Sequence, residues 1–338
     1  MDISVLDIGG NFAGPAIGLR ALGHRVLYYR SEPSWLSRFR LAVAQPVFDA
    51  DLVVVAGSFA DEQRILTQGA EAPGKLFPDE PLAESPHPAQ RAVRDLWLMP
   101  RLAATKELVF VDVSDSSDVD AELLRFGGTY LKRECALGDP LSKEVSPFPF
   151  LYHPILLELE WCDRLGGVLV PFEQRQQRNE ILFAGMLSHE RYANRREELF
   201  VRFATENPSV VTRSLHSSSL GQVWEQLQCA RASLYLAGAG QLCFRLHELA
   251  ALGVPAIMPE PWTIDVPDAW HDILPPTLAQ LRSPSDMLRF YRDHYHPKRA
   301  AEWLLRVVTT PQGARHASVA PDETGCAPSQ ADTPQPSK

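Results

Sequence analysis

Positive charge is in short supply in this 338-residue chain, where 33 lysines and arginines face 42 aspartates and glutamates. The net charge of −9 offers no broad basic surface to a phosphate backbone, so a nucleic-acid partner is not expected. Long apolar runs are also missing. No stretch approaches the roughly 20 apolar residues that cross a bilayer, so no membrane span is expected.

Cysteine is scarce and scattered. The five cysteines lack CxxC spacing and leave one unpaired, which argues against a disulfide framework and against a zinc knuckle. The N-terminus enters an apolar run directly after Asp2, without a basic leader. These absences predict a cytoplasmic protein with reduced thiols.

Short apolar runs and helical patterns instead alternate along the chain. Strands are expected at 3–8, 24–29, 52–56, 108–113, 181–185, 232–236 and 254–258, and helices at 15–22, 192–203, 220–230, 241–252, 284–295 and 297–308. This alternation predicts parallel sheets with right-handed crossovers, and the length predicts two domains. The expected fold class is therefore α/β with two Rossmann-like domains.

The domain limits follow from composition. The polar run 173–180 has no apolar periodicity and lies between apolar strands, so it predicts a hinge between domains 1–176 and 177–310. The segment 311–338 contains five prolines and almost no large apolar side chains. It is expected to be a disordered tail.

A two-glycine turn between an apolar strand and a helix is the most informative local pattern. Gly238 and Gly240 lack side chains, so a phosphate can approach the backbone at the positive end of the helix that follows. This turn predicts a pyrophosphate ligand. The earlier turn 9–14 lacks GxGxxG spacing, and it is interpreted either as a contact for the acceptor or as a simple turn.

Four segments carry a resemblance to a known family: ILFAGMLSHER at 181–191, ASLYLAGAGQLCFRLHELAALGVP at 232–255, VDVSD at 111–115 and YLKRE at 130–134. They resemble the CgeB-like and exostosin-like glycosyltransferases. The resemblance implies a GT-B fold, in which two Rossmann-like domains face a cleft. It further implies an acceptor domain at 1–176 and a nucleotide-sugar domain at 177–310.

The implied activity is transfer of a sugar from a nucleotide diphosphate to an acceptor, without a metal or other cofactor. In this resemblance Glu248 binds the ribose hydroxyls, while Arg245 holds phosphate or positions Glu248. Many retaining relatives have an earlier glutamate where this chain has Gly240. The sequence therefore leaves open whether the reaction inverts or retains, and it names neither the nucleobase, the acceptor nor the oligomeric state.

The loop containing Gly185, Ser188 and Arg191 corresponds to the place where GT-B enzymes present a cation to the leaving diphosphate. An arginine suits this task because its fixed fork of donors grips phosphate oxygens. Arg195 and Arg196 are equally available in the sequence.

Asp115 and His153 are the candidates for deprotonating the acceptor, with Arg191 as the third catalytic candidate. Asp112, Asp115 and Asp118 also suggest a metal site, but acidic residues and serines after a strand more often form turns and helix caps.

Three large side chains near the predicted nucleotide crossover are interpreted mainly as structural. Trp262 and Trp270 lie in a proline-rich loop, where they either stack on a ligand or anchor the loop by burial, and burial is favoured. His247, next to Glu248, is interpreted as a packing residue.

Two other functions remain open at this stage. Two Rossmann-like domains also suit an NAD(P)-dependent oxidoreductase, but the second strand offers no carboxylate before Glu32. A catalytically silent GT-B binding protein is the other alternative, because the first glutamate is missing at Gly240.

Overall fold

The structure is a computed structural model that describes residues 1–8, 11–31, 49–57, 106–115, 117–119, 123–124, 128–137, 145–171, 174–187, 195–215, 219–238 and 240–310. The segment 311–338, predicted to be a disordered tail, lies outside these residues.

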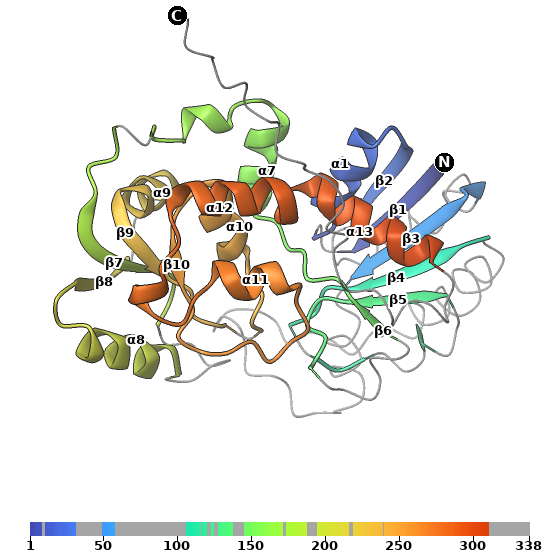
Figure 1. Cartoon of the computed structure of the whole chain (residues 1–338). Coiled ribbons are helices and arrows are strands. Elements are labelled where there is room, and N and C mark those ends of the chain that lie inside the picture. Colours follow the sequence, from blue (N-terminus) through green and yellow to red (C-terminus); the bar gives the residue numbers. More distant parts are fainter. Residues whose placement is uncertain are drawn as a thin grey trace, which may run out of the picture.

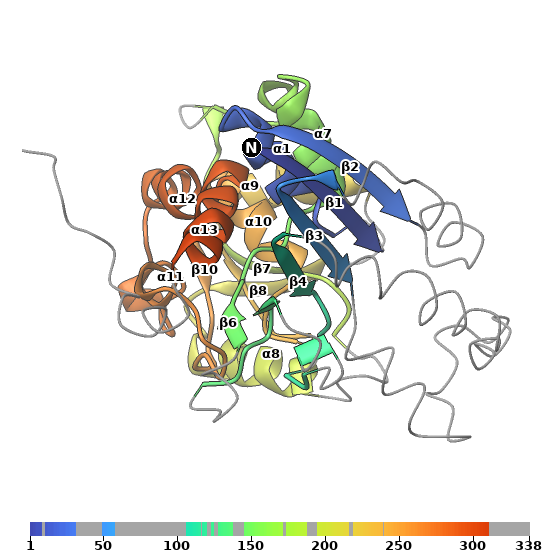
Figure 2. The same ribbon diagram turned by 90° about the vertical axis from the view of Figure 1, so that its right-hand side faces the viewer.

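The first sheet is parallel and six-stranded in the described part of the chain. Its strands, in spatial order, are β2 (Arg25–Ser31), β1 (Asp2–Ile8), β3 (Leu52–Gly57), β4 (Leu108–Asp112), β5 (Thr129–Lys132) and β6 (Val145–Pro147). Side chains are buried along the whole of β3, β4 and β5, as expected for a parallel sheet covered on both faces. Figure 2 shows the twist from β2 to β4.

The second sheet is also parallel, and its described strands number four. In spatial order they are β10 (Ala256–Ile257), β9 (Ala230–Leu234), β7 (Arg178–Ala184) and β8 (Val211–Leu215). The crossover helices are α8 (Arg195–Glu206), α9 (Leu220–Cys229) and α10 (Phe244–Ala251), while α1 (Ala13–Ala21) connects β1 to β2 in the first sheet. Figure 1 shows the two sheets in separate lobes.

The remaining elements connect the lobes and complete the C-terminal half. They are α7 (Pro154–Trp161), the 3-10 turn η4 (Leu165–Gly167), α11 (Asp268–Ile273), the 3-10 turn η6 (Leu278–Gln280), α12 (Pro284–Phe290), the π-helix η7 (Tyr291–Tyr295) and α13 (Pro297–Thr309).

The last helix returns to the first lobe. In Figure 1, α12 lies over the second lobe and α13 continues toward the first sheet, where it packs against α1. The approach is so close that a Cβ on Gly18 would overlap the carbonyl oxygen of Pro297 and stand 2.9 Å from the Cβ of Ala301. Only glycine at position 18 allows this contact.

The lobes also touch along the chain that follows β5. Ala136 forms an antiparallel bridge with Ile264, and the backbone N–H of Leu137 donates to the carbonyl of Thr263 over 3.0 Å. One hydrophobic cluster includes side chains from both sheets, such as Val54 in β3 and Leu182 in β7. The two lobes therefore share a core.

The predicted fold class is confirmed: the protein is α/β, with two Rossmann-like parallel sheets in a GT-B-type arrangement. The first sheet ends at Pro147 and the second begins at Arg178, and the domain boundary at 176/177 stays a prediction. The polar run 173–180 is not wholly a hinge, because β7 begins within it. No helix in the described ranges is long and apolar enough to cross a membrane.

Candidate functional site

In each sheet the strand order marks one place at the carboxyl ends of the strands where a ligand is expected. In the first sheet β2 and β3 lie on opposite sides of β1, and in the second β8 and β9 lie on opposite sides of β7. Ligands of open parallel sheets bind outside the carboxyl ends of the strands, where the order reverses. These switch points are β1/β3 and β7/β9.

A carboxylate of the protein itself occupies the first switch point. Asp7 is fully buried, and it accepts hydrogen bonds from the backbone N–H groups of Asn11 (3.1 Å) and Phe12 (2.7 Å) and from the hydroxyl of Tyr28 (2.5 Å). These are the N–H groups that lead into α1, where a dinucleotide would place its pyrophosphate. This arrangement disfavours an NAD(P) site there. Gly9 and Gly10 lie outside the described residues.

An arginine lies across the second switch point. Arg196, in the first turn of α8, donates from Nη1 to the carbonyl of Met186 after β7 (3.1 Å) and from Nε to the carbonyl of Ala237 after β9 (2.7 Å). A Cβ at Gly238 would stand 2.8 Å from Nη2 of Arg196, so the absence of a side chain lets the guanidinium approach the backbone. The sequence offered Arg196 only as one of several equally available cations.

The predicted leaving-group loop is described only in part. Gly185 follows β7 with a φ of +157°, and Met186 beside it is 57% exposed. Ser188 and Arg191 lie outside the described residues, so their roles stay predictions. Arg195 pairs with Glu260, at 2.7 Å between Nη2 and Oε1.

The two-glycine turn holds a carboxylate from the other lobe. Glu134, just after β5, accepts hydrogen bonds from the backbone N–H groups of Gln241 (Oε2, 3.0 Å) and Leu242 (Oε1, 2.7 Å). A Cβ at Gly240 would stand 2.6 Å from Oε1 of Glu134, so only glycine leaves room for this carboxylate. Burial raises the pKa of Glu134, although Arg133 and the two N–H groups oppose that rise.

The sequence did not predict this use of Glu134. The residue appeared only inside the YLKRE segment that carried the family resemblance. A partner 107 positions away cannot be inferred from spacing. The helix predicted at 241–252 begins at Phe244, and the backbone N–H groups of Gln241 and Leu242, which precede its N-cap Cys243, donate to Glu134.

Asp115 lies beside the same turn. Its backbone oxygen is 3.1 Å from the position of a Cβ at Gly240, and its side chain accepts a hydrogen bond from Nη2 of Arg133. The side chain is 40% exposed, so solvent reaches it. The structure thus brings together Asp115 and Gly240, which the sequence assigned to different domains.

A buried ion pair supports these strand ends. Asp112 accepts hydrogen bonds from Nζ of Lys132 (2.9 Å) and the hydroxyl of Tyr130 (2.8 Å), and Lys132 also contacts the hydroxyl of Ser114. Both charged groups are buried, and a buried pair is tolerated when further hydrogen bonds satisfy it. Among the described residues, no group of three or more His, Cys, Asp or Glu side chains is arranged to hold a metal ion.

Glu248 lies in the second turn of α10, inside a cluster of four side chains. Its carboxylate pairs with Arg245, lies 3.4 Å from Nε2 of His153 and accepts a hydrogen bond from Nε1 of Trp224 (3.3 Å). Only 2% of Glu248 is exposed. Its predicted contact with ribose therefore requires at least one of these three neighbouring side chains to move.

His153 is the N-cap of α7, and both its ring nitrogens are engaged. Nδ1 accepts from the backbone N–H of Leu156 (3.5 Å), and Nε2 faces Glu248. Burial lowers the pKa of His153, and the charge of Glu248 partly opposes that shift. In this arrangement His153 orients Glu248, and its role as a base stays a prediction.

The side chains interpreted as structural are buried. His247 is fully buried against Tyr152 and Tyr295, and its Nδ1 accepts from the backbone N–H of His153 over 2.8 Å. Trp270 is fully buried and Trp262 is 7% exposed. Both are buried, as the favoured interpretation expected, but Trp270 lies in α11 and not in the predicted loop, and only Trp262 anchors the loop that follows β10.

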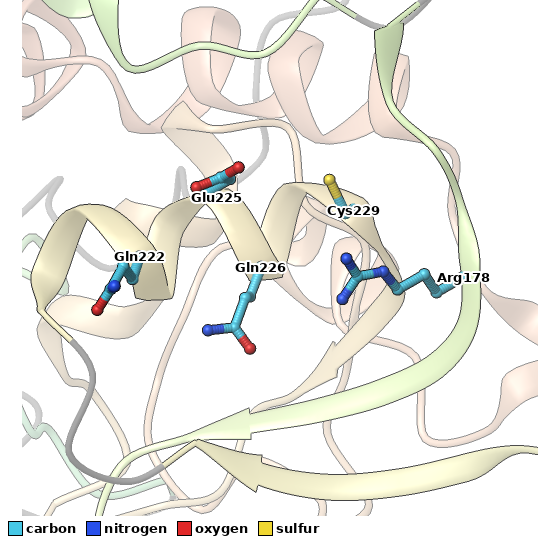
Figure 3. Close-up of a pocket in the computed structure, with 5 residues that line it drawn as sticks. All are labelled: Arg178, Gln222, Glu225, Gln226 and Cys229. Atoms are coloured by element: carbon cyan, nitrogen blue, oxygen red, sulfur yellow. The ribbon is translucent and has the colours of Figure 1, made fainter.

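A surface hollow of about 300 Å³ lies near the amino-terminal end of β7 in the second sheet (Figure 3). Arg178, the first residue of β7, extends toward the C-terminal end of α9, which contributes Gln222, Glu225, Gln226 and Cys229. Because it is at the start of β7, this hollow is separate from the switch point.

No protein-family model matches the sequence, and no curated protein is similar to it in sequence. The resemblance to the CgeB-like and exostosin-like family therefore stays a prediction.

Several solved structures match this chain over most of its length, but at low sequence identity and low TM-score. UDP-GlcNAc 2-epimerase from Methanocaldococcus jannaschii is 10% identical, with 91% of this chain and 99% of that chain covered and a TM-score of 0.41. The UDP-GlcNAc 2-epimerase from Neisseria meningitidis is 10% identical, with 90% and 99% covered and a TM-score of 0.39. Sucrose-phosphate synthase from Thermosynechococcus elongatus is 10% identical, with 91% and 94% covered and a TM-score of 0.32. Similarity at this level fixes neither the ligand nor the activity of this chain.

Proposed function

We propose that the protein is a metal-independent glycosyltransferase of the cytoplasm that takes its sugar from a nucleotide diphosphate. The observation that carries this proposal is the position of Arg196, whose guanidinium lies across the β7/β9 switch point. A diphosphate leaving group develops negative charge during transfer, and a fixed cation at the strand ends stabilises that charge. The equivalent position in the first sheet is filled by Asp7, so the donor belongs to the second lobe.

The other roles follow the predicted assignments. Gly238 lies against the guanidinium of Arg196, and Gly185 precedes Met186, whose carbonyl accepts from it. Ser188 and Arg191 would extend the same phosphate site. Glu248, held by Arg245, would bind the ribose.

Asp115 would deprotonate the acceptor. It is partly exposed, it belongs to the first lobe, and it lies against the turn that precedes α10. A general base has to reach the proton of the acceptor hydroxyl, whose oxygen lies next to the donor sugar when transfer occurs, and a residue where the two lobes meet can do so.

The proposal is tested by titration calorimetry with UDP, GDP, dTDP and ADP, followed by assays for sugar-dependent release of the nucleotide. Replacing Arg196 by alanine should weaken diphosphate binding by about 1.5–3 kcal/mol, the contribution of a charged hydrogen bond. The same loss is expected for Arg191→Ala if the predicted loop contact forms.

Arg231→Ala is the matched control, because Arg231 lies near the start of β9, at the opposite edge of the same sheet. The Arg231→Ala variant should bind the nucleoside diphosphates with the same affinity as the wild type. If none of the four nucleotides binds, or if Arg196→Ala binds as well as the wild type, the proposal is wrong. Nucleotide binding without sugar release from any donor would instead identify a silent binding protein, and NADH binding at the first lobe would identify an oxidoreductase.

A further inference from the structure

The contact between Glu134 and the glycine turn has the chemistry of an anion site with its anion in place. Glu134 is 3% exposed, and its two carboxylate oxygens accept from two successive backbone N–H groups, those of Gln241 and Leu242. Gly240 leaves the required space. The acceptor groups come from one lobe and the donor groups from the other.

A third donor at this point, in the described part of the chain, lacks a hydrogen bond. Nε of Arg133 is buried and makes no hydrogen bond within the described part of the chain, and it lies 3.8 Å from Oε1 of Glu134. The guanidinium is held from its other side by Asp115. A carboxylate satisfies the two N–H groups with its two oxygens, whereas a phosphate group has a further oxygen for Nε of Arg133.

We propose that Glu134 is an internal stand-in for a phosphate group of the donor, which displaces it and binds the N–H groups of Gln241 and Leu242 together with Arg133. This inference rests on the proposed function and adds two residues of the first lobe to the donor site. Donor binding then breaks one contact between the lobes, while the pairing of 136–137 with 263–264 keeps them joined.

Release into solvent removes the desolvation cost of the ionised Glu134 carboxylate. Burial raises the pKa of Glu134, which means that the ionised carboxylate is held at a cost that solvent removes. Asp7 differs in this respect, because it lies only four and five residues from the N–H groups that it binds. A local carboxylate of that kind remains next to its donors, whereas Glu134 leaves if the lobes or its rotamer shift.

The test is titration calorimetry of the full chain with inorganic pyrophosphate. Glu134→Gln removes the competing charge and presents an amide N–H₂ to one of the two N–H groups, so pyrophosphate should bind about tenfold more tightly than to the wild type. Glu134→Asp shortens the side chain by one methylene group and moves the carboxylate away from the two N–H groups. It should increase the affinity for pyrophosphate by a smaller factor, and it replaces the glutamine variant if that variant does not fold.

Adding Arg133→Lys to Glu134→Gln should remove most of the gain, because lysine cannot present the Nε donor. Glu160→Gln is the matched control: this carboxylate contacts Tyr291 and His296, away from the turn, and its loss should leave the affinity unchanged. Equal or weaker binding by both Glu134 variants overturns the inference.

The outcomes separate this inference from the proposed function. If the wild type releases nucleotide from a sugar donor but the Glu134 variants bind pyrophosphate no more tightly, only the inference fails. If the variants bind more tightly but no sugar donor is ever used, only the proposed transferase activity fails.

Discussion

At the scale of single residues, a carboxylate accepts backbone hydrogen bonds both in the turn that follows β1 and in the turn that contains Gly240. Asp7 does so within its own lobe, and Glu134 does so across the lobes. A buried N–H group without a partner costs free energy, so each turn needs an acceptor when no ligand is present. The two carboxylates differ in their separation along the sequence from the N–H groups that they bind, which is four and five residues for Asp7 and 107 and 108 residues for Glu134.

His247 supplies a residue-scale prediction about pH. Burial among aromatic rings lowers its pKa from 6.5 to about 3, so the folded protein keeps the imidazole neutral where the unfolded chain binds a proton. Between pH 6.5 and 3 the unfolded chain binds a proton that the folded protein does not, so this one group should reduce the free energy of unfolding by about 1.4 kcal/mol per pH unit as the pH falls.

Urea denaturation between pH 7 and pH 4.5 measures this slope. His247→Asn removes the titration, and its amide oxygen can still accept from the N–H of His153. The variant should be less stable than the wild type at pH 7, and the gap should narrow toward acid. A gap that stays constant over this range would show that His247 does not carry the pH dependence.

At the scale of elements, the sequence predicted the strands and helices with clear periodicity. β1, β3, β4 and the helices α9 and α13 lie close to their predicted ranges. It missed β5 and β6, which have four and three residues, and β8, whose centre is Thr212–Ser214. Short strands and polar edge strands carry too little apolar pattern to be recognised, because neighbouring strands and not their own side chains hold them in place.

The interface between α1 and α13 gives an element-scale prediction. Gly18→Ala should destabilise the protein by about 1–3 kcal/mol, because the new methyl group overlaps the carbonyl of Pro297 and forces the helices apart. Gly221→Ala makes the same change in α9, where a Cβ meets nothing within 4 Å, and it should stabilise by up to about 1 kcal/mol.

Thermal and urea unfolding of both variants measure the two effects. The opposite signs are the essential result, since the intrinsic helix preference is shared and only the surroundings differ. Two variants that are stabilised alike would mean that α1 and α13 do not approach closely.

At the scale of the whole molecule, the candidate site depends on contacts that the sequence cannot register. The sequence identified the turn with Gly238 and Gly240, and it named Asp115 and Glu248. It did not show that Asp115 lies beside Gly240, because these residues belong to different lobes. Nor did it single out Arg196, whose position follows from the strand order and not from its neighbours in sequence.

The shared core leads to the last prediction, which concerns cooperativity. Leu304 of α13 is fully buried in the cluster that contains side chains from both sheets. Leu304→Ala should therefore lower the stability of the whole molecule by about 2–5 kcal/mol, through lost burial and the cavity that remains. Tryptophan fluorescence reports on both lobes, because Trp224 and Trp270 lie in the second lobe while Trp303 donates a hydrogen bond to the carbonyl of Pro147 in β6 of the first. Far-ultraviolet circular dichroism reports on the helices and strands of both lobes.

In a single cooperative unit, both signals should shift to the same lower urea midpoint in the variant. Arg306→Ala, an exposed change on the same helix, should leave both midpoints in place. If the fluorescence and dichroism signals of Leu304→Ala gave different midpoints, or if either signal split into two transitions, the molecule would not be a single cooperative unit. The two lobes would then unfold independently despite their common cluster.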